Sequence, residues 1–287
     1  MIEKSLYEHL TSQEDLAAYL ASYLGRPAVF NQEVPADTDP DWGDGPQYGR
    51  IVFAVDLQGD PERDVAATLS VDILCQKGEQ FPEEIEPIVK GLIDGWFFVG
   101  TEGNMACQWK NSSYFTEPTN QVVGCTVVFD LLAFPMVTTG IPDVIGRFNE
   151  WTAQIEGLHV LNFAPLPYAA WKPKGDESAV YWRLVSDGSA GWIRDTYQTI
   201  YRKAIVKGHI FSASIDRSTA VTRDLYVRLY AARRLLKQGE TPIMVNQKNT
   251  MDAGADPLRT GQLSVEATYG IIVRFQNEKT LGHITCR

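Results

Sequence analysis

The sequence predicts an α+β protein of two tandem domains, each a mainly antiparallel sheet packed by two helices. The chain has 287 residues, more than the roughly 100–200 of a typical single domain. Apolar residues make up 44% and charged residues 22%, proportions that suit a globular protein with well-filled cores. The order helix, strands, helix, two strands occurs twice along the chain. These three observations define the expected domains, residues 1–135 and 142–287.

The first domain is expected to open with a helix over residues 2–24, where apolar residues recur mostly every four positions with a break near 11–15. A short strand at 28–30 precedes a turn-rich acidic loop. Two longer strands follow at 50–57 and 67–75, joined by the turn GDPER. The former is nearly all apolar, whereas the latter alternates and predicts one buried face.

Helical spacing then returns, and we predict a second helix that begins at residue 82. Pro87 is expected within its first turn, where the missing N–H of proline has no cost. Three glutamates in this region suit the positive end of the helix dipole. Strands near 105–111 and 121–134 complete the domain, and alternation in the last indicates a sheet packed chiefly on one face.

The proline-bounded segment 135–142 (PMVTTGIP) is a predicted linker, after which the order of elements begins again. A helix is predicted over 143–156. Strands are predicted at 159–163, 179–185 and 201–212, from their apolar and β-branched content.

The next helix is predicted over 220–237, with Ser218 and Thr219 as potential N-caps and Gly239 as a stop. Its predicted apolar stripe is Leu225, Leu229 and Leu236. Strands at 242–247 and 263–275 mirror the last two strands of the first domain. Because identity between the halves is low, a true duplication and a chance likeness of two α+β domains both stay open.

The net charge of −10 conceals a division between the halves. Residues 1–140 hold 7 Lys and Arg against 22 Asp and Glu, giving −15, and residues 141–287 hold 19 against 14, giving +5. Opposed halves would attract each other across a head-to-tail interface, although simple solvation explains them equally well. The acidic total argues against a nucleic-acid sleeve.

The sequence holds no catalytic motif, so we predict no enzyme activity, no cofactor and no metal. The serine-nucleophile elbow, the zinc-binding helix, the phosphate loop and the dinucleotide fingerprint are all missing. Four histidines are scattered singly. The stretch DTDPDWGDG superficially resembles a calcium loop but has Trp42 where glycine is needed and Tyr48 where glutamate is needed.

Three stretches are candidate interfaces, each with an ordinary alternative. The first is the acidic loop Asp37, Asp39, Asp41, Trp42 and Asp44, whose tryptophan is either tucked against its own domain or offered to a neighbouring subunit. The second is the stretch 109–120, with Trp109, Tyr114 and Phe115, which otherwise is an ordinary long hairpin. The third comprises Arg228, Arg233 and Arg234 of the predicted 220–237 helix, which either form a solvated face or meet the acidic domain of the next subunit.

The chain begins without a basic, apolar leader and holds no run of 18 apolar residues, so we expect a protein made inside the cell and no membrane partner. The cysteines are Cys75, Cys107, Cys125 and Cys286. Their spacing fits no zinc or redox pattern, and we expect reduced thiols that pack mostly as small hydrophobic residues.

The first half resembles a known family. The stretches MIEKSLYEHL, GPQYGRIVFAVDLQGDPER, QFPEEIEPIVKGLIDGWFF and WKNSSYFTEPTNQVVGCTVVFDLLAFP look like tail-terminator or tail-completion proteins of bacteriophages, encoded in prophages of intestinal Gram-positive bacteria. The resemblance covers about residues 1–140, and the second half only through its order of elements.

This resemblance implies a virion assembly protein that forms an oligomeric ring, commonly hexameric, on the end of the tail tube. Its expected partners are copies of itself, the tail tube protein and head-completion or neck proteins. The resemblance implies no active site. It would occupy the host cytoplasm during assembly and then the virion tail. Members of the family are usually single-domain, so rings of three or of six such chains both fit.

Two other classes of function compete with this one. A binding module outside any virion would hold a ligand between its domains, since ligand pockets favour domain interfaces. An enzyme would require paired titratable groups in a buried cleft.

Overall fold

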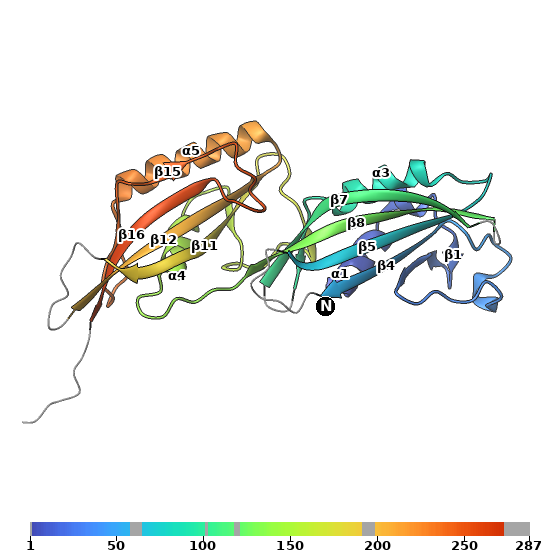
Figure 1. Ribbon diagram of the computed structural model, residues 1–287, viewed down its shortest axis with the longest axis horizontal. Helices are drawn as coiled ribbons and strands as arrows, with labels where there is room; N and C mark the ends of the chain where they lie inside the picture. Colours follow the sequence, from blue (N-terminus) through green and yellow to red (C-terminus); the bar gives the residue numbers. More distant parts are fainter. Residues whose placement is uncertain (1, 58–64, 101–102, 118–120, 191–198, 273–287) are drawn as a thin grey trace, which may run out of the picture. The chain divides into compact units, whose positions relative to one another are not determined.

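A computed structural model describes residues 2–57, 65–100, 103–117, 121–190 and 199–272. The chain divides into two compact units. Unit 1 contains residues 1–136 and 164–175, and unit 2 contains residues 137–163 and 176–287. Each unit is a curved sheet with helices against it, so the predicted α+β class is confirmed (Figure 1). The predicted turn at 59–63, His283 and Cys286 lie outside the described residues.

Unit 1 begins with α1 (Ile2–Thr11) and α2 (Glu14–Ala17), separated at the expected break. Its remaining elements are β1 (Ser22–Tyr23), β2 (Arg26–Pro27), β3 (Val29–Asn31), η1 (Pro40–Trp42), β4 (Arg50–Leu57), β5 (Val65–Gln76), α3 (Pro82–Ile93), β6 (Phe97–Val99), β7 (Gly103–Glu117) and β8 (Val122–Pro135). The sheet runs β10-β6-β7-β8-β5-β4-β3, where β10 is Ala170–Trp171, and only the β3–β4 pair is parallel among these pairs.

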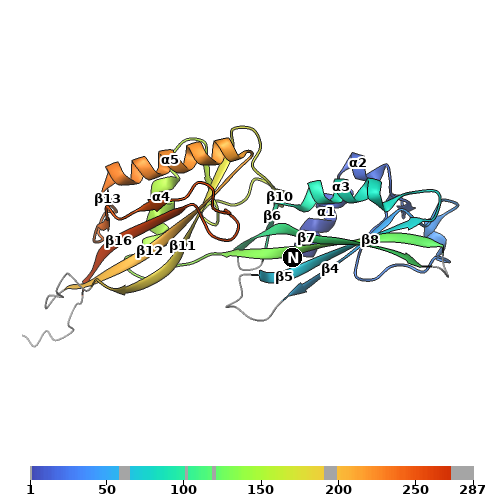
Figure 2. The same ribbon diagram turned by 45° about the horizontal axis from the view of Figure 1, so that its top comes forward.

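The core of unit 1 lies between its helices and one face of this sheet (Figure 2). Leu6 of α1 and Ile85 of α3 are fully buried against alternate residues of β5 and β8, such as Leu69 and Phe129. The alternation predicted for these strands is therefore the alternation between core and open face.

Pro87 is the one residue of this helix that differs from expectation. It lies in the middle of α3 rather than in the first turn, because the helix begins five residues earlier, at Pro82. Proline there leaves the carbonyl of Glu83 without its helical donor. Pro87 is exposed, so water can reach this side of the helix.

Unit 2 repeats the order helix, strands, helix, strands with fewer short elements at its start. These are α4 (Val144–Thr152), β9 (Leu158–Val160), β11 (Ser178–Ser189), β12 (Thr199–Ser212), α5 (Ile215–Ala232), β13 (Arg234–Leu235), β14 (Ile243–Val245), β15 (Thr250–Met251) and β16 (Leu263–Ile272). Its sheet runs β13-β14-β16-β12-β11-β9, with β15 also paired to β16 and with only β9–β11 parallel among these pairs. Both helices pack on the same face of the sheet (Figure 2). There Phe148 and Leu225 share a core with Trp182.

The two sheets share one topology. Reading from the edge, β6-β7-β8-β5-β4-β3 of unit 1 corresponds to β13-β14-β16-β12-β11-β9 of unit 2, and the single parallel pair stands at the same edge in both. In each, one helix precedes the parallel pair and another follows the two long central strands. The repeated order of elements in the sequence thus corresponds to a repeated three-dimensional arrangement.

One segment of the second half packs on the first unit. Strand β10 (Ala170–Trp171) pairs antiparallel with β6, where Trp171 is opposite Phe97 and the two rings lie 6.1 Å apart. Lys172 Nζ donates to the carbonyl of Asp94 at 2.7 Å. The sequence prediction placed these residues within 142–287, whereas here they extend the sheet of unit 1 and cover its edge.

The predicted 220–237 helix was placed too late in the chain. Helix α5 begins at Ile215, because Ser214 Oγ accepts from the Arg217 amide at 3.2 Å and thus forms the N-cap. It ends at Ala232, since Arg233 adopts a left-handed conformation. Leu225 and Leu229 are buried as predicted, but Leu236 is exposed and Leu235 of β13 is buried instead.

Candidate interaction surfaces

The candidate stretch with Trp109, Tyr114 and Phe115 lies where α3 crosses β7. Lys90 Nζ lies 3.7 Å from the ring centroid of Trp109, whose Nε1 donates to Ser112 Oγ at 3.1 Å. Ser112 Oγ donates to Glu86 Oε1 at 2.7 Å, and the Tyr114 hydroxyl donates to Glu86 Oε2 at 3.1 Å. Trp109 is 40% and Tyr114 50% exposed, so the rings are both oriented and accessible.

These contacts shift two pKa values in this α3–β7 surface. Hydrogen bonds from Ser112 and Tyr114, with the charge of Lys90, hold the pKa of Glu86 below its usual range. Desolvation and the hydrogen bond to Glu86 raise the pKa of Tyr114 to about 12. Glu86 therefore stays ionised as the acceptor that orients the hydroxyls. The surface is preorganised, which lowers the entropy lost on binding a partner.

Next to it, a groove of about 410 Å³ lies between the end of β7 and the start of α3. Its walls include Phe81, which is 55% exposed, and Phe115, which is 39% exposed. The Phe115 ring lies against Gly124, where any Cβ would overlap it. Residues 109–117 belong to strand β7, as the hairpin alternative expects. Residues 118–120 lie outside the described part of the chain.

The acidic loop does not offer its tryptophan to a partner. Trp42 is 3% exposed, packs against Ala28 and the rings of Tyr23 and Phe30, and donates from Nε1 to the Ala36 carbonyl at 3.1 Å. Of the two alternatives that the sequence allowed, the structure therefore has the one in which this ring anchors the loop to its own unit.

The four aspartates of this loop have different surroundings. Asp37 accepts from Arg50 at 2.8 Å and from the Tyr48 hydroxyl at 2.9 Å; burial opposes its ionisation, but these bonds keep its pKa lowered. Asp39 accepts from the Asp41 amide at 2.9 Å. Asp41 and Asp44 are exposed, and among the described residues their carboxylates have no hydrogen bond or ion pair.

The three arginines predicted to share a helix face do not share one. Arg228 lies on α5 and pairs with Asp224 at 2.7 Å, where both side chains are about half exposed. Arg233 forms the C-cap, and Arg234 belongs to β13. An exposed pair of this kind contributes little to stability. Because the helix ends at Ala232, these residues form no continuous basic face.

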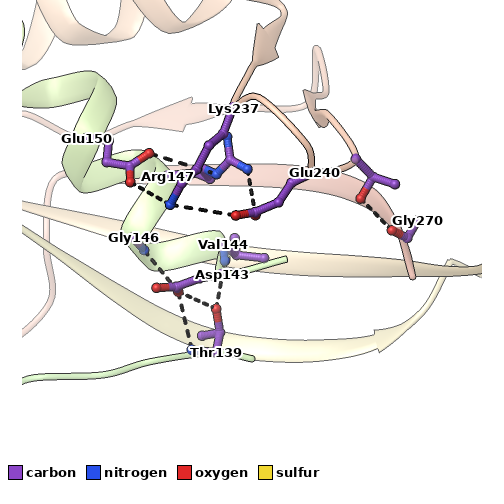
Figure 3. A network of polar contacts seen from close by, with 10 residues as sticks. Thr139, Asp143, Val144, Gly146, Arg147, Glu150, Lys237, Glu240 and Gly270 are labelled. Atoms are coloured by element: carbon purple, nitrogen blue, oxygen red, sulfur yellow. Dashed lines mark hydrogen bonds and ion pairs between the residues drawn. The ribbon is translucent and has the colours of Figure 1, made fainter. Parts of the chain in front are cut away.

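Unit 2 also holds a charge network that the sequence did not reveal (Figure 3). Arg147 of α4 is 2% exposed, and its Nη2 donates to Glu240 at 2.6 Å, while Nε lies 4.0 Å from Glu150. Lys237 Nζ lies 2.9 Å from Glu150 and 3.6 Å from Glu240. Hydrogen bonds with Arg147 lower the pKa of Glu240, and those with Glu150 raise the pKa of Lys237. Two cations and two anions balance, so this network fastens α4 to the segment after β13.

Thr139 and Asp143 prepare the start of α4 in the same region (Figure 3). Asp143 Oδ1 accepts from the Gly146 amide at 3.0 Å and from the Thr139 hydroxyl at 2.8 Å. Thr139 Oγ1 in turn accepts from the Val144 amide at 2.7 Å. Two otherwise unpaired helix donors are thereby satisfied, which positions Arg147 one turn later.

A second unexpected feature of unit 2 is a basic cavity of about 310 Å³. Its lining residues include Arg183 of β11, Lys207 and His209 of β12, and Arg259 and Thr260 of the loop before β16. These come from three separate stretches of sequence. No local signal would have identified the cavity.

Comparison with known proteins adds no assignment, since no family model, curated protein or solved structure matches this chain. Within the described ranges no group of three or more His, Cys, Asp or Glu side chains could hold a metal ion. No helix among the described residues is long and apolar enough to cross a membrane.

Proposed function

We propose that this protein is a structural, ring-forming component of a bacteriophage tail, of the tail-terminator or tail-completion kind, at the end of the tail tube or in the neck. The observation that carries the proposal is the occurrence of one sheet topology in two units of opposite charge. Unit 1 holds 9 Lys and Arg against 22 Asp and Glu, giving −13, and unit 2 holds 17 against 14, giving +3.

Opposite charge favours a heterologous, head-to-tail contact in which unit 1 of one copy meets unit 2 of the next. Heterologous contacts produce closed rings when the rotation between subunits closes. Electrostatic complementarity would set the register and speed of association. The likeness of the first half to tail-terminator proteins supplies the biological setting, with the tail tube protein and head-completion proteins as partners and the host cytoplasm as the place of assembly.

The mass of the assembly tests this proposal. One chain has a mass of 32.1 kDa, so three chains would give about 96 kDa and six about 193 kDa. Native mass spectrometry and light scattering should find one of these species, alone or after addition of the tail tube protein. The ring should also stop tube polymerisation when added in less than equimolar amount. A strict monomer at high concentration that leaves tube growth unchanged would overturn the proposal.

A further inference from the structure

The basic cavity lies on the open face of the second sheet, away from α4 and α5. Val206 and Trp182 point into the core, so their neighbours Lys207 and Arg183 point to the other face. Arg183 and Lys207 are direct partners across the β11–β12 pair. Like charges placed directly opposite in a sheet repel each other, so this arrangement favours an anion between them.

The cations of the cavity are only partly compensated. Lys207 Nζ donates to the Thr260 carbonyl at 3.1 Å, and in the part of the chain that the structure describes the Arg183 guanidinium has no hydrogen bond or ion pair. Asp256 is the acidic neighbour, and its carboxylate accepts from the Leu258 amide at 2.9 Å. Arg183 and Lys207 thus leave positive charge at the cavity.

The acidic loop of unit 1 has the complementary surplus. Its Asp41 and Asp44 carboxylates are exposed, whereas Asp37 and Asp39 are engaged within the loop. The buried Trp42 between them holds the backbone in place. A loop fixed in advance presents its carboxylates with little further loss of entropy.

We propose that Asp41 and Asp44 of one copy dock into the Arg183–Lys207 cavity of a second copy. This inference rests on the proposed ring and names its head-to-tail contact. A guanidinium binds a carboxylate through two parallel N–H donors, and the adjacent ammonium adds a third. The contact relieves the repulsion between Arg183 and Lys207 in the same step. Repeated from copy to copy, it joins unit 1 to unit 2 around the ring.

Charge reversal tests the contact from both sides. R183E/K207E and D41K/D44K should each raise the dissociation constant of the assembly by at least about 100-fold in light scattering or native mass spectrometry. R223E/R228E on α5 changes the charge of unit 2 equally at another place and should change the constant by less than about 3-fold. Circular dichroism melting checks that each variant is folded. An equal loss in all three variants would overturn the inference, because charge alone would then explain it.

Mixing distinguishes a contact between copies from one within a chain. Equimolar R183E/K207E and D41K/D44K should assemble together into a ring of six, because the two variants can alternate there and each reversed loop then meets a reversed cavity; a ring of three cannot alternate them and would be restored only in part. A variant with all four substitutions in one chain should assemble by itself, because its reversed loop meets the reversed cavity of the next copy. Unchanged assembly of R183E/K207E would overturn this inference and leave the ring standing, whereas a wild-type protein that never assembles would overturn the ring itself.

Discussion

Units 1 and 2 have the same strand order but are held together by different side chains. The interior of unit 1 joins helices and sheet through aliphatic and aromatic groups and three cysteine thiols. In unit 2, Trp182 Nε1 donates to Thr152 Oγ1 at 2.8 Å within the core, and Gln262 both accepts from and donates to the backbone of Ile210. One topology is therefore compatible with a mainly apolar interior and with one in which hydrogen-bonded polar side chains also take part.

Matched core truncations should have the largest effects. Phe129→Ala in unit 1 and Phe148→Ala in unit 2 each remove a fully buried ring, and each should lower the free energy of unfolding by about 3–5 kcal/mol. In calorimetry, each change should lower the melting transition of its own unit. Equal shifts of a single transition would show that the units unfold together, which would contradict the expectation that each substitution affects only its own unit.

Acid should weaken unit 2 through His209. Burial, with Arg183 and Lys207 nearby, lowers the pKa of His209 to about 4 from its usual value of about 6.5. Between these pH values the unfolded chain binds a proton that the folded chain does not, so stability falls as the pH decreases through this window and is unaffected above it. The loss should reach about 3 kcal/mol.

His209→Gln is the matched variant, since it cannot take up that proton. Its unfolding free energy should vary less than that of the wild type between pH 6.5 and 4. In unit 1, burial also lowers the pKa of His9, so His9→Gln provides the counterpart with the same sign. Parallel pH profiles for His209→Gln and the wild type would contradict the assignment.

Loss of the Arg147 network should have a smaller effect, confined to unit 2. Arg147→Ala removes the cation that bonds Glu240 and should cost about 2 kcal/mol. Arg147→Met fills the same space without charge and should cost less, because hydrophobic replacements of buried ion pairs are often tolerated. Urea unfolding of both variants measures the difference, and an equal cost would show that loss of the charge rather than loss of packing is responsible.

The three cysteines of unit 1 should react negligibly with thiol reagents while this unit is folded. Burial raises the pKa of Cys75 and of Cys125 to about 11 and holds that of Cys107 well above its usual range, which keeps the nucleophilic thiolate scarce. In a Cys286→Ser background, thiol labelling should therefore follow the unfolding of unit 1 alone. Labelling that follows the unfolding of unit 2 would contradict this prediction.

The spacing of apolar residues was sufficient to predict much of the fold. Strand β4 begins and ends where it was predicted, and the break between α1 and α2 lies at the expected residues. The predicted helix at 220–237 was less accurate, since Ser214 and Ser218 are both plausible caps and only packing distinguishes them. Composition was sufficient to locate the acidic and aromatic candidate stretches. It was not sufficient to predict whether the Trp42 side chain faces its own unit or the solvent.

The features that could be predicted from sequence are local, because periodicity, turn residues and the repeated order of elements all depend on residues close in the chain. Which distant residues meet depends on the tertiary structure. Packing of α4 brings Arg147 to Glu240, whereas strand register joins β10 to the first sheet and places Arg183 opposite Lys207. Register depends on burial of whole faces and on long-range pairing, and neither leaves a mark in a short stretch of sequence.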